Sequence, residues 1–266
     1  MDSFYHQAHP GLTFSFVGWA LIAGLTIFYL GSVYAQHTDH KWNRWRIIFF
    51  LLSAVFLGVA VSPQLVNWAH HDLRGHMVQH LLIGMMAPLG LVLAAPMMLA
   101  LRTMPVSAAR RVTSILRSRP IHLLAHPVTA FMLNIGGMYV LYMTPLYAAT
   151  LDAPVLHHLV HVHFFLAGYL FCWAILAGPD PAPRPTVMRF RLAVLFISIA
   201  AHAILGKLMY GYLLPRNTLH SVEEIQAAAQ IIYYGGDFAE LLLVIALFGM
   251  WYNKRTSRRY AFFSVS

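Results

Sequence analysis

The sequence predicts an all-α, polytopic membrane protein, a seven-transmembrane helix bundle with its N-terminus outside and its C-terminus in the cytoplasm. Three observations support this prediction: a low content of charged residues, seven apolar runs, and basic residues in alternate gaps between the runs. Charged residues make up only 10% of the 266 residues and hydrophobic residues 59%, whereas a soluble domain has about 25% charged residues. Seven spans of about 20 residues use most of such a chain. We therefore expect one transmembrane helical domain, residues 1–266, and no soluble domain.

The apolar runs have the length of membrane spans and are separated by proline and charged residues. A spanning helix needs about 20 predominantly apolar residues. Proline-containing breaks occur at Ser62-Pro63, at Arg119-Pro120 and in the stretch from Pro179 to Pro185, and proline is a strong local signal for a turn or a helix boundary. The predicted spans are 12–34, 47–62, 76–101, 127–147, 155–177, 190–213 and 229–252.

Basic residues set the predicted orientation. Fifteen Lys and Arg residues fall in the segments 35–46, 102–126 and 178–191 and in the C-terminal tail. The alternate loops contain only Arg74 and Arg216. Because short cytoplasmic loops are enriched in Lys and Arg, the C-terminus is predicted to be cytoplasmic. The formal net charge of +9 then indicates loops that face anionic lipid, and we expect no nucleic acid as a partner.

Histidines are concentrated towards the predicted outer side. His76 and His80 are four residues apart at the start of the third span, and His157 and His161 repeat this spacing in the fifth. Residues four apart share one helix face, and both spans run from outside to inside. The four imidazoles are therefore predicted to form one outer layer that could ligate a metal, while His163 points elsewhere. The alternative is a set of interfacial histidines hydrated by lipid headgroups.

Two carboxylates in the seventh span extend this prediction. Asp237 and Glu240 are three residues apart, and a carboxylate inside a span normally faces the bundle interior and a partner. At about 1.5 Å per residue, Asp237 is predicted roughly 12 Å from the outer end of its helix and His161 roughly 9 Å from that of its own. The carboxylates could thus meet the histidines. An ion pair between Asp237 and Lys207 is the structural alternative. Four further possibilities stay open, namely that the site includes His158, His202, Lys207 or any of the methionines.

The chain lacks the short motifs that accompany common catalytic mechanisms. It contains one cysteine, Cys172, which excludes an intrachain disulfide and a CxxC motif. It has no GxSxG, Walker A or HExxH motif. We therefore expect a protein that is not an enzyme.

Three segments resemble a known family. The stretch His76-Met-Val-Gln-His80, followed by Ala87-Pro88 and Ala95-Pro96, is similar to the third helix of the multispan CtaG-type cytochrome c oxidase assembly factors. The stretch His157 to His161, followed by Phe164, Gly168 and Phe171-Cys-Trp173, resembles the fifth helix of that family, and Tyr234-Gly-Gly-Asp-Phe-Ala-Glu240 resembles the seventh. The resemblance extends from about the second predicted span to the seventh.

The resemblance implies a multi-pass protein of the bacterial inner (plasma) membrane that assists maturation of a haem–copper oxidase of the respiratory chain. It implies copper as the metal, a chaperone role and an oxidase subunit as partner, and it leaves open whether the chain forms a homo-oligomer. The metal ligands that it implies are His76, His80, His157 and His161, with Asp237 and Glu240 as further candidates.

Two alternative functions remain. A haem-binding electron-transfer protein could use histidines such as His80 and His161 as axial ligands, and we rank haem below copper. A metal or proton transporter would need a polar path to the cytoplasm, but few polar residues lie beyond Glu240 and His202 in their spans.

Overall fold

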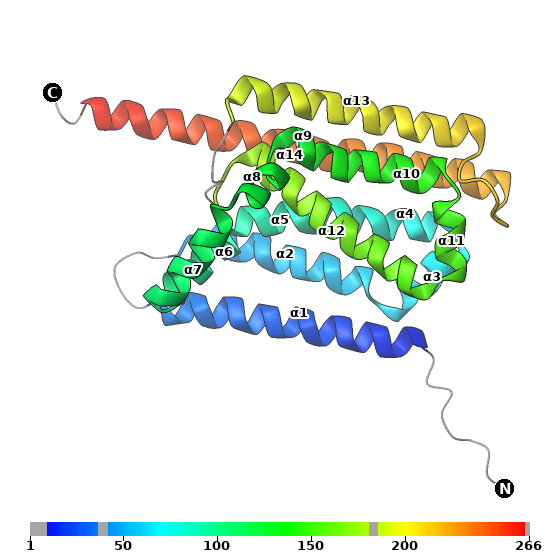
Figure 1. Cartoon of the computed structure of the whole chain (residues 1–266), viewed down its shortest axis with the longest axis horizontal. Helices are drawn as coiled ribbons and strands as arrows, with labels where there is room; N and C mark the ends of the chain where they lie inside the picture. Colours follow the sequence, from blue (N-terminus) through cyan, green and yellow to red (C-terminus); the bar gives the residue numbers. More distant parts are fainter. Residues whose placement is uncertain (1–9, 37–41, 181–185, 264–266) are drawn as a thin grey trace, which may run out of the picture.

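The protein is a bundle of roughly parallel helices, seen side-on in Figure 1. The computed structural model describes residues 10–36, 42–180 and 186–263. We call the end of the bundle at α3 and α11 the α3 end, and the opposite end, at α6 and α7, the α7 end. The first half contains α1 (Pro10–Ala35), α2 (Arg44–Ala60), α3 (Pro63–His71), α4 (Leu73–Leu81), η1 (Leu82–Met86), α5 (Ala87–Ala94), α6 (Pro96–Thr103), α7 (Val106–Leu116) and α8 (Arg119–Leu124). The second half contains α9 (Pro127–Phe131), η2 (Met132–Gly136), α10 (Gly137–Met143), α11 (Leu146–Asp152), α12 (Pro154–Leu176), α13 (Met188–Tyr212) and α14 (Val222–Phe263).

Several of these segments are long and apolar enough to cross a membrane. Five qualify by length and hydropathy within the described part of the chain, namely Ser15–Ala35, Leu73–Ala94, Pro154–Leu176, Met188–Tyr212 and Val222–Lys254. A sixth would be the pair α2 and α3, which is bent by 54°, and Pro127–Met143 is a shorter apolar segment. The prediction of an all-helical, multi-pass membrane protein is therefore confirmed. The count of seven spans and the orientation of the termini stay predictions.

The predicted third span, 76–101, differs from the structure at its end. The helical segment stops at Ala94, Ala95 adopts a left-handed conformation with φ of 52°, and α6 begins at Pro96. Proline cannot donate a backbone hydrogen bond, and it disfavours the α conformation in the residue before it. The predicted boundary at residue 101 was wrong because the apolar character of the sequence continues through this break.

A π-helical turn inside the same span brings its backbone close to α12. Pro88 has no N–H to donate to the carbonyl group of Gly84, four residues earlier, and the turn Leu82–Met86 widens into a π-helix next to it. Gly168 of α12 lies against this turn, where an added Cβ atom would be only 2.0 Å from the carbonyl oxygen of Gly84. Glycine at position 168 thus permits a backbone contact that holds the two histidine-bearing helices side by side.

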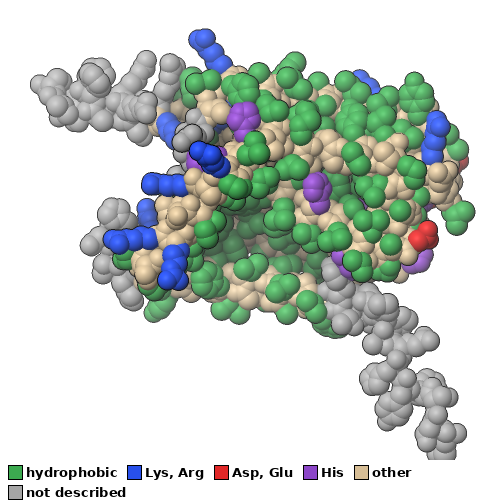
Figure 2. Space-filling model, viewed as in Figure 1, with side chains coloured by type: hydrophobic (Ala, Val, Ile, Leu, Met, Phe, Trp, Pro, Cys, Tyr) green, Lys and Arg blue, Asp and Glu red, His purple; other side chains and the backbone are tan. Residues whose placement is uncertain are grey.

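Apolar side chains fill the bundle and also cover its outer surface. One buried cluster lies towards the α3 end and includes Met77, Tyr147 and Phe164. A second includes Trp173 and Leu247. Large apolar side chains are exposed along α1, α2, α12, α13 and α14, and Figure 2 shows green apolar side chains over most of the visible face. Such a surface suits contact with lipid tails.

Candidate metal-binding site

Three histidine rings lie close together inside the bundle near the α3 end. His76 comes from α4, and His157 and His161 come from successive turns of α12. The ring centres of His76 and His161 are 5.7 Å apart, those of His76 and His157 are 6.0 Å apart, and those of His157 and His161 are 4.4 Å apart. His163 points away, as predicted, with its Nε2 atom 3.0 Å from the carbonyl oxygen of Leu133. We call His76, His157 and His161 the histidine triad.

His80 lies one turn deeper than His76 on the same face of the chain. Its ring is buried against the ring of Phe164, with the centres 4.6 Å apart, and that of Tyr142 lies 6.3 Å away. The rings of Phe164 and Tyr142 thus form an aromatic layer on the inner side of the triad. His80 is close to the triad in sequence and depth, but its nearest ring partners are aromatic side chains.

His70 is a neighbour of the triad that the sequence analysis did not select. It lies in the last turn of α3, and its ring stacks on that of His157 with the centres 4.8 Å apart. The predicted second span ended at residue 62, so the short helix that carries His70 was not anticipated. The available signal was the pair His70-His71 only six residues before His76.

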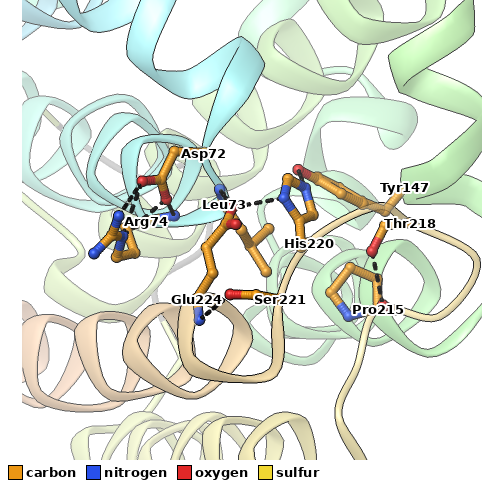
Figure 3. A network of polar contacts seen from close by, with 9 residues as sticks. All are labelled: Asp72, Leu73, Arg74, Tyr147, Pro215, Thr218, His220, Ser221 and Glu224. Carbon is orange, nitrogen blue, oxygen red and sulfur yellow. Dashed lines mark hydrogen bonds and ion pairs between the residues drawn. The ribbon is translucent and has the colours of Figure 1, made fainter.

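A network of polar contacts, drawn in Figure 3, lies next to the triad and reaches it through Tyr147. The ring of Tyr147 lies 5.0 Å from that of His76, and its hydroxyl oxygen lies 3.3 Å from Nε2 of His220. The other ring nitrogen of His220 contacts the carboxylate of Glu224. Because an ionised carboxylate only accepts hydrogen bonds, Nδ1 of His220 is the donor in this contact. Glu224 also accepts from the backbone N–H of Leu73 at 2.6 Å, so this network ties the first turns of α4 and α14 together.

Charge and burial at the same end shift two pKa values. Asp72 caps α4, because its carboxylate accepts a hydrogen bond from the backbone N–H of Arg74. Hydrogen bonds from the Arg74 guanidinium lower the pKa of Asp72 to about 2. Burial raises the pKa of Tyr147, and the nearby carboxylates of Glu224 and Asp72 add to this increase. Tyr147 therefore stays a neutral phenol at physiological pH.

The carboxylates of α14 lie deeper than predicted. The helix begins at Val222, seven residues before the predicted start, so Asp237 is roughly 22 Å from its first residue and not roughly 12 Å. Glu240 lies beside His202, with Oε1 and Nδ1 3.6 Å apart. Both side chains are almost completely buried, at 3% and 1% exposure. We call His202 and Glu240 the buried pair.

The alternative ion pair of Asp237 with Lys207 is not found. Among the described residues, the ion pairs within 4.0 Å join other groups. Lys207 is exposed, and its Nζ atom lies 5.7 Å from the centre of the Tyr233 ring. Asp237 is partly buried.

A small cavity adjoins the buried pair. It has a volume of about 20 Å³, and Gly84, Asn134, Cys172 and Glu240 are among its lining residues, so it can hold about one water molecule. Within the described residues, neither carboxylate oxygen of Glu240 and neither ring nitrogen of His202 has a hydrogen-bond partner. The lining is mostly apolar, and Asn134 and Glu240 contribute its polar side chains.

In their present conformations, no three His, Cys, Asp or Glu side chains of the described residues could hold a metal ion together. The three rings of the triad therefore lie close together, but their nitrogen atoms are not arranged around one common point. Of the six residues predicted from the sequence, the structure groups His76, His157 and His161, puts His80 one turn below them, and pairs Glu240 with His202. It leaves Asp237 apart from the triad.

Comparison with known proteins finds relatives of much greater length. The chain is 31% identical over 199 residues to uncharacterised proteins of Mycobacterium bovis and Mycobacterium tuberculosis. Each match covers 72% of this chain and 30% of the relative. An uncharacterised protein of Mycobacterium leprae is 30% identical over 194 residues, which cover 70% of this chain and 29% of that protein. The chain thus spans about a third of the length of these relatives.

No solved structure matches the chain significantly. Residues 27–254 match the model of a family described as cytochrome c oxidase caa3 assembly factor (Caa3_CtaG). This match confirms the resemblance drawn from the histidine-bearing segments. The chain therefore belongs to the caa3-type family of cytochrome c oxidase assembly factors.

Proposed function

We propose that the chain assists assembly of a haem–copper cytochrome c oxidase by binding copper as cargo at the histidine triad and passing it to a nascent oxidase subunit. Family membership supports the assembly role, and the gathering of three imidazoles supports the cargo. Imidazole is a good ligand for copper. His80 below the triad and His70 beside it supply further imidazoles for capture or release.

The spacing of the rings is the observation that carries this proposal. Two imidazoles bound to one tetrahedral ion at nitrogen–metal distances near 2 Å have ring centres roughly 5 Å apart. The three separations in the triad, 4.4, 5.7 and 6.0 Å, bracket this value. Rotation of the side chains would then aim the nitrogens at one ion without movement of the helices. The ring of His161 already has an Nε2 atom with no hydrogen-bond partner among the described residues.

The proposal includes a topology of seven spans in a bacterial plasma membrane, with the N-terminus outside and the C-terminus in the cytoplasm. The bent pair α2 and α3 and the short segment Pro127–Met143 would complete the five longer spans. His76 lies three residues and His161 seven residues from the first residue of its helix, roughly 5 and 10 Å along the axis. The triad would then lie in the outer leaflet, near enough to water for copper to exchange. A reporter fused after Ser266 should be cytoplasmic, and a periplasmic reporter would reverse this placement.

Copper analysis of the purified full-length chain tests the site. His76→Ala and His157→Ala should each lower copper affinity at least tenfold, because loss even of a residue that only orients a ligand costs 10- to 100-fold. His163→Ala is the matched control, since it removes an imidazole of the same helix that points away, and its affinity should stay within about twofold of the parent. Equal copper content in all four proteins would reject the site.

The same preparations separate the proposal from haem binding. A parent protein that holds copper and lacks a Soret absorption band agrees with the proposal. A Soret band that disappears in His80→Ala, without bound copper, would favour the electron-transfer alternative. In host membranes, the two triad variants should lower haem–copper oxidase activity, whereas His163→Ala should not.

A further inference from the structure

An apolar groove runs along α1 on the side that faces the rest of the bundle. Its volume is about 440 Å³, and its walls come from α1, α2, α6 and α12 through residues such as Ile22, Leu57, Ala100 and Phe165. Figure 2 shows the corresponding hollow between the band of side chains that covers α1 and the main body. The groove lies apart from the histidine triad and has no part in the proposed copper chemistry.

The length of the groove matches one leaflet of a bilayer. Its lining on α1 extends from Ile22 to Ser32, and ten residues of helix span roughly 15 Å. The hydrocarbon core of a bilayer is about 30 Å thick, so one leaflet contributes about 15 Å. The lining also includes Pro96, Met104 and Val112, which places the groove in the leaflet at the α7 end.

The volume is too small to contain a transmembrane helix. A helix about 10 Å wide and 30 Å long displaces roughly 2,000 Å³, several times the volume of the groove. A single extended hydrocarbon chain, one methylene wide, is a much closer match. The apolar walls are also suited to such a chain, because they offer little that would hold a polar ligand.

Basic residues lie at the end where the headgroup of such a lipid would be. Val112 of α7 closes the groove, and Arg110 and Arg111 precede it on the same helix and are exposed. Arg102 at the end of α6 is exposed as well. Figure 2 shows blue basic side chains gathered at this end of the hollow. A helix with one apolar face and one basic face is typical of the membrane interface, where it attracts anionic lipids.

We propose that the groove binds one acyl chain of an anionic phospholipid from the leaflet at the α7 end, with the headgroup phosphate held by Arg110 and Arg111. The lipid would fill the space between α1 and α12 and so attach the peripheral helix α1 to the bundle. Few side chains of α1 are buried by the protein itself; those among its described residues are Ser15, Tyr29 and Ser32.

Native mass spectrometry of the full chain in detergent tests this site. The probes are phosphatidylglycerol and phosphatidylcholine with identical acyl chains, added separately to delipidated protein. The parent should hold one phosphatidylglycerol molecule at a concentration at least fivefold below that needed for phosphatidylcholine. Equal retention of the two lipids would overturn the assignment of the headgroup. Inorganic phosphate should not displace the lipid, and displacement by phosphate would show a free anion site instead.

Variants distinguish the contribution of the acyl chain to binding from that of the headgroup. Ala100→Trp and Leu57→Trp each place an indole in the groove and should weaken binding of both lipids severalfold. Val55→Trp, at an exposed position of α2 outside the lining, is the matched control and should bind as the parent does. Arg110→Gln combined with Arg111→Gln should abolish the preference for phosphatidylglycerol and keep the weaker binding of phosphatidylcholine. Unchanged binding in two groove variants that elute as folded protein would overturn the proposal, as would a bound peptide in place of the lipid.

Discussion

The histidine triad and the buried pair both place imidazoles inside the bundle, but they differ in what surrounds the rings. The triad is flanked by aromatic rings and by a network that reaches the loops of the α3 end, through Tyr147, His220 and Glu224. The buried pair lies beside a cavity of about 20 Å³, and its polar atoms lack hydrogen-bond partners among the described residues.

This difference indicates that the triad is suited to exchange of an ion and the buried pair to support of the fold. A site that loads and releases an ion needs a short route to water and ligands that can turn, and the triad lies within about two turns of the first residues of α4 and α12. A buried carboxyl group beside a buried imidazole is costly to separate from it, because each group would then lose its polar neighbour in the interior. The buried pair therefore favours a fixed arrangement of α13 and α14.

The largest expected effect is on the buried pair. His202→Ala should destabilise the protein by about 1–3 kcal/mol, because it leaves the buried carboxyl group of Glu240 without its polar neighbour. The double variant His202→Leu with Glu240→Leu should recover most of this loss. Thermal unfolding in detergent measures both, and copper content should remain that of the parent in whatever folded protein is recovered. Loss of copper at unchanged thermal stability would instead join the pair and the triad into one site.

The next effect tests whether the network around Tyr147 positions the triad. Tyr147→Phe removes the hydroxyl group that contacts His220, and it should lower copper affinity about tenfold, the lower range for residues that orient a ligand. Tyr139→Phe is the matched control, because it removes a hydrogen bond of the same kind, to the carbonyl oxygen of Ala201, outside this network. Equal affinities in the two variants would show that Tyr147 only fills space.

A smaller effect is expected at Lys207. Because Lys207 is exposed and forms no ion pair within 4.0 Å with Asp237, Lys207→Met should change stability by no more than about 0.5 kcal/mol. It should also fail to rescue Asp237→Asn in thermal unfolding. Recovery of stability in the double variant would restore the ion pair considered from the sequence.

The smallest effect concerns acid stability at the α3 end. The pKa of Asp72 in the folded protein, about 2, lies below the usual value near 4 for an unfolded chain. Its charged form therefore stabilises the fold fully above about pH 4, and this contribution is lost as the pH falls towards 2. Thermal midpoints of the parent and of Asp72→Asn should differ by a constant amount above pH 4 and converge below it. A difference that keeps its full size at about pH 2 would contradict this account.

The sequence was sufficient for the all-helical, multi-pass class and for the contact between the two histidine-bearing helices. Apolar run lengths and the four-residue spacing are local properties, and they placed His76 near His161. The pairing of Glu240 with His202 could not be predicted, because it depends on where α14 begins, and Val222 starts that helix in a stretch with two glutamates. His70 was missed for a related reason, since the bend between α2 and α3 returns a short amphipathic helix to the bundle.

The backbone contact between Gly84 and Gly168 is a point about which α12 can tilt relative to η1. Gly168 lies seven residues from His161 along α12, which is a lever arm of roughly 10 Å. A tilt of α12 by about 10° around this contact would move His161 nearly 2 Å relative to His76, about a third of the 5.7 Å that separates their ring centres. Such a tilt would separate the two histidine-bearing helices at the triad, while the close packing at Gly168 stays in place.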